Sequence, residues 1–185
     1  MRKKLFILVV LLQVLFLVGM IVNNLSIIWW GKEIILLSQP VDPHSLFSGD
    51  YVNLGYEISS LNLQEMGYPA LPQDSFNRGD RIYVKLEKQG PEWQAAALSR
   101  DAREFSNSLF IQGEITYFDY ISQNLTIRYG IENYYAPSDK ARHYQSTLSD
   151  SMPIKVMVDR FGRAKVIGPQ ESIKQIENNT KGDRG

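Results

Sequence analysis

A run of apolar residues near the N-terminus constrains this chain more than any other feature. Residues 5–22, LFILVVLLQVLFLVGMIV, contain a single polar side chain, Gln13, and no charge. At about 1.5 Å per residue, a helix of this length extends about 27 Å, close to the thickness of a hydrocarbon core. The run predicts a transmembrane helix, in which Gln13 is expected to snorkel or to pair with another helix rather than to line an ion path.

The flanks of this run predict its orientation. Residues 2–4 are Arg-Lys-Lys, and no acidic residue occurs before Glu33. Basic flanks favour the cytoplasmic side, so the rest of the chain is expected outside the cytoplasm. Trp29 and Trp30 suit the opposite interface, where indole rings favour the headgroup level. The expected location is therefore a single-pass protein of the plasma or inner membrane, or of a thylakoid in a photosynthetic source.

Two alternatives to an uncleaved anchor compete for residues 1–30. A signal peptide has a shorter apolar region, about 7–15 residues, and ends at a small-x-small site. The segment IVNNLSIIWW, residues 21–30, offers no such site. A buried core helix would show an amphipathic stripe, whereas residues 5–28 carry no charge on any face. An uncleaved signal anchor is the favoured interpretation.

Composition limits the classes of function. The chain has no cysteine, which excludes a disulfide framework, a thiolate metal site and a cysteine nucleophile. Residues 31–185 hold 17 basic and 20 acidic side chains, a net charge of −3. A nucleic-acid-binding domain usually carries a strong positive charge, so nucleic acid is not an expected partner. No cofactor is predicted.

Beyond the anchor, apolar residues alternate with polar ones, and turn residues recur at short intervals, as is typical of β-strands. Strands are expected around residues 34–37, 51–58, 82–87, 92–99, 109–118 and 125–134, followed by a hairpin over 152–168. Seven or eight short strands predict a mainly β fold, an antiparallel sandwich or a partly open barrel. One short helix is expected at 137–148, with Ser138 as its N-cap. The β domain should cover residues 31–168, and 169–185 should form a polar, flexible tail.

The strand pattern also predicts which side chains are buried. In SGDYVNLGYEI, residues 48–58, one face should enter the core: Val52, Leu54, Tyr56 and Ile58. RGDRIYVKLEK, residues 78–88, repeats this arrangement, with Ile82, Val84 and Leu86 inward. In the expected strand 125–134 the buried set is Leu125, Ile127, Tyr129 and Ile131. A Gly-Asp pair precedes each of the first two strands, at 49–50 and 79–80, because Gly tolerates positive φ and Asp closes a turn.

The outward face of these strands is a candidate partner surface. Large amphipathic rings are favoured at interfaces, although single tyrosines on strands also pack against neighbouring strands. The candidate residues for an exposed partner face are Tyr51, Asn53, Glu57 and Tyr83, to which Tyr134 and Tyr135 add further rings.

A family resemblance rests on the first of these strands. Gly49, Asp50, Tyr51, Leu54 and Tyr56 spell G-D-Y-x-x-L-x-Y. RGDRIYVKL, IQGEI, RYGIENYYAP and the final hairpin follow in order. The chain resembles the bacterial family named after that motif, the GDYXXLXY proteins. The resemblance implies an uncharacterised membrane-anchored protein, often encoded beside a multipass membrane protein, and it supplies no catalytic residues. The family usually has an acidic residue directly after the proline that follows YGIE, where this chain has Ser138.

A serine hydrolase of the Ser-Lys type is the sharpest catalytic alternative. An anchor followed by an outer β domain loosely resembles type I signal peptidases, and Ser38 or Ser48 with Lys85 are the candidate residues. Such chemistry needs a serine beside a lysine whose pKa is lowered by burial. The Ser-Met pair typical of those peptidases is missing, and Lys85 is expected to point outward.

Metal and glycosidase sites find less support. His44 lies near Asp42 and Asp50, but zinc takes three or four ligands, and the other histidine, His143, falls in the expected helix. Asp50 and Glu57 should face opposite ways on one strand, which disfavours a paired-carboxylate site.

The favoured function is a non-enzymatic binding or accessory subunit of a membrane assembly. The lipid bilayer is its expected partner, and the family resemblance implies a multipass membrane protein as a second one. A structural membrane-associated protein is the third hypothesis.

Overall fold

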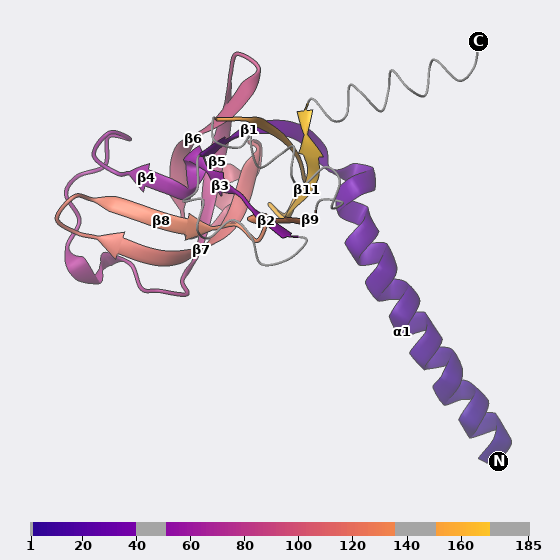
Figure 1. Cartoon of the computed structure of the whole chain (residues 1–185). Helices are drawn as coiled ribbons and strands as arrows, with labels where there is room; N and C mark the ends of the chain where they lie inside the picture. The colour runs from indigo at the N-terminus through magenta and orange to yellow at the C-terminus, as the bar shows by residue number, and fades with distance from the viewer. Residues whose placement is uncertain (1, 40–50, 136–150, 171–185) are drawn as a thin grey trace, which may run out of the picture.

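A long N-terminal helix projects from a β domain in the computed structural model, which describes residues 2–39, 51–135 and 151–170 (Figure 1). The helix α1 covers Arg2–Trp30. Within it, Lys3–Trp30 is long and apolar enough to cross a membrane, and the rest of the described protein covers none of its most apolar stretch. Several predictions fall outside the described residues: Ser48, Gly49 and Asp50, His44, the helix at 137–148 with Ser138 and His143, and most of the tail.

The β domain contains two main antiparallel sheets. The four-stranded sheet has the order β11-β10-β1-β3, with β1 Lys32–Gln39, β3 Gly55–Tyr56, β10 Pro153–Val158 and β11 Ala164–Pro169. The five-stranded sheet has the order β4-β8-β7-β5-β6, with β4 Ser60–Asn62, β5 Arg81–Gln89, β6 Glu92–Ser99, β7 Phe110–Asp119 and β8 Asn124–Arg128. A ribbon pairs β2 Tyr51–Asn53 with β9 Asn133–Tyr135. The prediction of a mainly β, antiparallel fold is confirmed.

One core joins both sheets, because the inward residues of each pack into a single apolar cluster. Ile34 on β1, Val84 on β5 and Val156 on β10 are each at most 1% exposed. The predicted inward sets at 82–86 and 125–131 are buried, as are Leu54, Tyr56 and Ile58. The C-terminal hairpin is also confirmed, and its turn contains Gly162 with φ +79°, a left-handed conformation that glycine adopts without strain.

Two expected strands are each divided in the structure, which explains why the described residues form more strands than predicted. After β3 the chain makes a 3₁₀ turn, Glu57–Ser59, and then enters the five-stranded sheet as β4. The segment 51–62 therefore crosses between the sheets instead of running as one strand. The expected strand 125–134 likewise leaves the five-stranded sheet after Arg128 and pairs as β9 with β2.

Gly79 and Asp80 form the turn before β5. Gly79 has φ +92°, as the Gly-Asp prediction requires. The Asp80 carboxylate accepts a hydrogen bond from the Asn77 N–H at 3.1 Å, so Asp80 closes the turn from its C-terminal side. Two further 3₁₀ turns, Gln73–Ser75 and Ala102–Phe105, lie in connecting segments.

Candidate functional site

Two buried tyrosines join the family motif to a distant part of the chain. Tyr56, the last motif residue, donates its hydroxyl proton to the Ile131 carbonyl at 2.9 Å. Tyr129 donates to the Ile58 carbonyl at 2.6 Å. The two bonds are reciprocal: Tyr56 bonds to the carbonyl two positions after Tyr129, and Tyr129 bonds to the carbonyl two positions after Tyr56. We call these four residues, Tyr56, Ile58, Tyr129 and Ile131, the tyrosine lock.

Glu132 supports the tyrosine lock from its edge. Its carboxylate accepts from the Tyr129 N–H at 2.5 Å, and its carbonyl accepts from the Leu54 N–H at 2.6 Å. Burial, and secondarily the negative charge of Glu132, raises the pKa of Tyr56 well above its ordinary value. The same two causes raise the pKa of Tyr129. Both phenols are therefore protonated at neutral pH and act as hydrogen-bond donors, not as general bases. The tyrosine lock thus stabilises the fold at the point where the chain passes between the two sheets.

The other motif residues and the expected partner face occupy varied environments. Leu54 is 4% exposed and belongs to the core. Tyr51 and Asn53 lie on β2, in register with Tyr135 and Asn133. Glu57 is half-buried in the 3₁₀ turn. Tyr83 is half-buried, and its ring packs edge-on against Phe110 with centroids 5.7 Å apart.

An open depression of about 280 Å³ lies beside the five-stranded sheet, where Tyr129 of the tyrosine lock contributes to its lining. Its lining residues are Gly79, Arg81, Gln112, Gly113, Glu114, Arg128, Tyr129 and Gly130. Glu114 stands between two arginines in register, Arg81 and Arg128, and its carboxylate lies 3.0 Å from the Arg128 guanidinium. A Cβ on Gly113 would approach the Ile127 side chain to 2.3 Å, so the sheet packs closely at this point. Glu114 is paired with Arg128, and the Tyr129 hydroxyl is engaged with the Ile58 carbonyl, so the lining offers mainly hydrogen-bond donors.

Ser38 and Lys85, the Ser-Lys candidates among the described residues, each interact with a different residue and not with each other. Ser38 is 1% exposed, and its hydroxyl oxygen accepts from the Met152 N–H at 3.0 Å. Lys85 pairs with Glu87 at 2.6 Å on the outer face of β5. A serine without an adjacent base is a weak nucleophile. Here the Ser38 hydroxyl contacts a backbone N–H instead of a base, and Lys85 is paired with a carboxylate instead of a serine.

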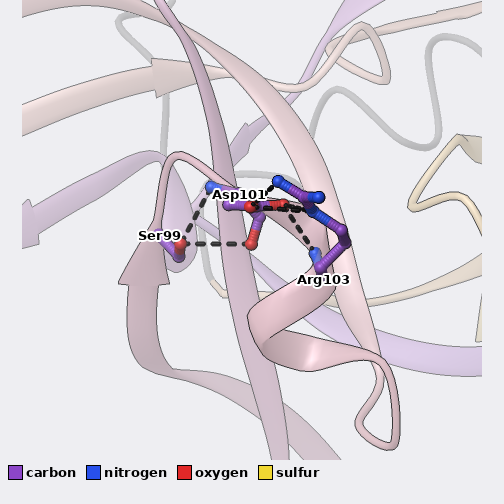
Figure 2. Close-up of polar contacts among 3 residues, drawn as sticks. All are labelled: Ser99, Asp101 and Arg103. Carbon is purple, nitrogen blue, oxygen red and sulfur yellow. Dashed lines mark hydrogen bonds and ion pairs between the residues drawn. The ribbon is translucent and has the colours of Figure 1, made fainter.

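Ser99, Asp101 and Arg103 form a polar cluster at the end of β6 (Figure 2). The Asp101 carboxylate accepts from the Arg103 N–H at 2.9 Å and from the Arg103 guanidinium, while the Asp101 N–H donates to the Ser99 hydroxyl at 2.9 Å. The hydrogen bonds from Arg103 lower the pKa of Asp101. This cluster caps the 3₁₀ turn Ala102–Phe105, and its permanently protonated arginine is no general base.

A metal site would need several ligating side chains in one place. Among residues 2–39, 51–135 and 151–170, no group of three or more His, Cys, Asp or Glu residues is placed to hold a metal ion. Both histidines lie outside these ranges, so the site suggested by His44 receives no structural description.

The junction between α1 and the β domain is held by polar contacts that the sequence pattern did not reveal. Arg163, after the hairpin turn, donates to the Asn23 side-chain oxygen at 3.0 Å and to the Ser26 hydroxyl at 3.3 Å. Asp159 is 7% exposed and holds the same guanidinium at 2.7 Å. Ile27 is buried against the domain. These contacts dock the last turns of α1 on the β10–β11 hairpin.

An exposed apolar tip at the β7–β8 turn is the other feature that the sequence analysis missed. Tyr117, Tyr120 and Ile121 are 63%, 45% and 78% exposed. The turn lies on the side of the domain away from α1 (Figure 1). Asp119 shapes it by accepting from the Ile121 N–H at 2.9 Å. The sequence signal was available, because YFDYIS places apolar residues directly around a turn, where polar residues are the rule.

The fold and its site thus define a class: a small antiparallel β domain carried on an apolar N-terminal helix, with a buried tyrosine lock beneath its signature motif. A family model described as "GDYXXLXY protein" matches residues 13–168. The chain belongs to this family, as the motif at 49–56 indicated. Comparison with curated proteins and with solved structures found no match.

Proposed function

We propose that this protein is a single-pass membrane protein whose β domain lies outside the cytoplasm and acts as a non-enzymatic binding or accessory subunit of a membrane assembly. The observation that carries this proposal is the exposed apolar helix α1, which passes into β1 with only Gly31 between them. A helix that is apolar on all sides requires a lipid or protein environment. The basic residues 2–4 favour the orientation.

The binding role is supported by the distribution of exposed apolar side chains on the β domain. The tip formed by Tyr117, Tyr120 and Ile121 lies away from α1, where a partner in the same membrane assembly has access to it. Tyrosine is favoured at protein interfaces. The non-enzymatic role is supported by Ser38, Ser99 and Lys85, which are each engaged in contacts that leave no activated nucleophile.

Topology is tested with single cysteines, for which the cysteine-free chain is a ready background. Gln89→Cys, at the exposed end of β5, should react with a membrane-impermeant maleimide in intact spheroplasts. Lys4→Cys should react only after lysis. The reverse pattern would contradict the proposed orientation, and labelling of both positions in a soluble fraction would contradict anchoring.

The accessory role is tested by photo-crosslinking in intact membranes. A photoreactive residue at Ile121 should form an adduct with a membrane protein, identified by mass spectrometry. The matched control places the same residue at exposed Lys88. Recovery of only free monomers from both positions would count against an accessory subunit and would favour a purely structural role. Labelling of the wild type by a fluorophosphonate probe, lost in Ser48→Ala or in Ser38→Ala, would overturn the non-enzymatic assignment.

A further inference from the structure

The turn of the β10–β11 hairpin carries an exposed ring between two arginines. Phe161 is 54% exposed. The Arg160 guanidinium lies 4.7 Å from the centre of this ring, and the Arg163 guanidinium lies 5.7 Å from it. We call Arg160, Phe161 and Arg163 the basic hairpin tip. It combines positive charge with an apolar ring, a composition typical of membrane-surface contacts.

The conformation of this tip is held by Asp159. Its carboxylate accepts from the N–H groups of Phe161 and Arg163, each at 2.9 Å. The carboxylate also pairs with the Arg163 side chain. Because Asp159 neutralises Arg163, the charge available to a ligand belongs to Arg160, which forms no ion pair with any other described residue.

The contact with α1 sets the height of the tip relative to a bilayer. The Arg163 guanidinium lies against Asn23 and Ser26. The apolar run ends at Val22, so Asn23 stands where hydrocarbon gives way to headgroups when α1 spans a membrane. The headgroup layer is about 5–7 Å thick on each side. The Phe161 ring lies 5.7 Å from the same guanidinium, a separation similar to the thickness of this layer, so the ring has the headgroups within its reach.

We propose that the basic hairpin tip binds the headgroups of anionic phospholipids, with Arg160 contacting a lipid phosphate and Phe161 inserted at the boundary of the acyl chains. This inference rests on the proposed membrane anchoring and adds a lipid class and a contact site to it. The tip thereby holds the β domain against the membrane surface instead of leaving it free on its anchor.

The test measures depth in the membrane with a fluorescent dye on single cysteines in the full chain, reconstituted in nanodiscs. The positions are Phe161→Cys, Ile121→Cys at the opposite tip, and Gly19→Cys within α1, where the structure leaves open space. Lipids with a quencher at the headgroup should quench the dye at 161 but not at 121. Equal quenching at 161 and 121 would overturn the inference.

Lipid charge is tested by comparing phosphatidylcholine discs with discs that also contain phosphatidylglycerol. One basic side chain near an anionic surface changes the ratio of bound to unbound domain about fivefold. Arg160→Glu should therefore lower this ratio, calculated from the quenching at 161, by about fivefold or more in anionic discs and leave it unchanged in phosphatidylcholine discs. The matched control is Lys88→Glu, on the β5–β6 hairpin that rises away from the N-terminal end of α1 (Figure 1). Equal quenching at 161 in the two kinds of disc, unchanged by Arg160→Glu, would contradict the proposed binding to anionic headgroups.

The dye at Gly19→Cys separates this inference from the anchoring on which it rests. Quenching of that dye by acyl-chain quenchers, without quenching at 161, would refute the hairpin contact and leave the anchor intact. A dye at 19 that escapes acyl-chain quenchers would refute the anchor itself.

Discussion

Two tyrosine-containing regions of the β domain use the same residue type in opposite ways. In the tyrosine lock, Tyr56 and Tyr129 are buried, and each hydroxyl donates to a backbone carbonyl. At the β7–β8 turn, Tyr117 and Tyr120 are 63% and 45% exposed. The lock joins segments more than 70 residues apart, whereas the turn joins neighbouring strands. The comparison separates tyrosines that maintain the fold from tyrosines available to a partner, and it predicts graded effects of mutation.

The largest effect is expected beside the lock. Leu54→Asp would place a carboxylate in the apolar core, where an uncompensated charge costs on the order of 3–5 kcal/mol. The domain should unfold, as measured by loss of near-ultraviolet circular dichroism. Gln89→Asp, on an exposed strand end, is the control and should retain the wild-type spectrum. A folded Leu54→Asp protein would mean that the motif strand does not face the core.

Alkaline pH should weaken the lock next most strongly. The folded protein raises the pKa of Tyr56 and Tyr129, so folding favours their neutral forms. Stability from this source is complete below the unfolded pKa of about 10 and falls above it, by about 1.4 kcal/mol per pH unit for each tyrosine. Denaturant unfolding between pH 9 and 11.5 should show this decline.

The double variant Tyr56→Phe/Tyr129→Phe provides the comparison for the alkaline experiment. It lacks both ionisable hydroxyls, so its unfolding free energy should fall less steeply above pH 10 than that of the wild type. Parallel declines in the two proteins would show that other groups control alkaline stability.

Removing one hydroxyl should have an intermediate effect. Tyr56→Phe leaves the buried Ile131 carbonyl without its donor, and Tyr129→Phe does the same to the Ile58 carbonyl. Each change should cost about 1–3 kcal/mol of unfolding free energy. Tyr117→Phe removes the same atom from an exposed ring and is the matched control, with an expected change below about 0.5 kcal/mol. Equal effects at 56 and 117 would remove the distinction between the regions.

The smallest effect on stability should come from the exposed tip itself. Ile121→Ser changes a residue that is 78% exposed, so the unfolding free energy should change by less than about 0.5 kcal/mol. Thermal unfolding followed by circular dichroism measures this. Crosslinking from Tyr117 in the same variant should nevertheless decrease if the tip binds a partner. A large loss of stability would place Ile121 in the fold instead of on its surface.

Side-chain alternation in the sequence predicted the core well because burial depends on which face a residue occupies. Leu54, Tyr56 and Ile58 remain on the core face even though the backbone turns out of the strand at Glu57. Alternation also predicted Tyr129 and Ile131, where the chain leaves β8. The pattern therefore gave the buried residues correctly while concealing the breaks that divide each strand.

Contacts between distant segments could not be predicted in the same way. The lock depends on the pairing of residues 56 with 131 and 58 with 129, and a single sequence does not contain that register. The same holds for Arg163 and Asn23, which are 140 positions apart. The exposed tip at Ile121 was overlooked for a different reason, since an apolar residue in a turn can be buried or exposed.

The passage from α1 to β1 through Gly31 alone has a mechanical consequence. A Cβ at position 31 would approach the Ile27 carbonyl oxygen to 2.2 Å, so the polypeptide bends too tightly there for a larger residue. Arg163 also donates to Asn23 and Ser26, so the tight bend and these hydrogen bonds together restrict the angle between the helix and the β domain. Rotation of the helix about its axis, or a change of its tilt in a thinner bilayer, would swing the Ile121 tip through an arc. In a membrane-spanning α1, the orientation of the helix would therefore set the direction in which this tip faces.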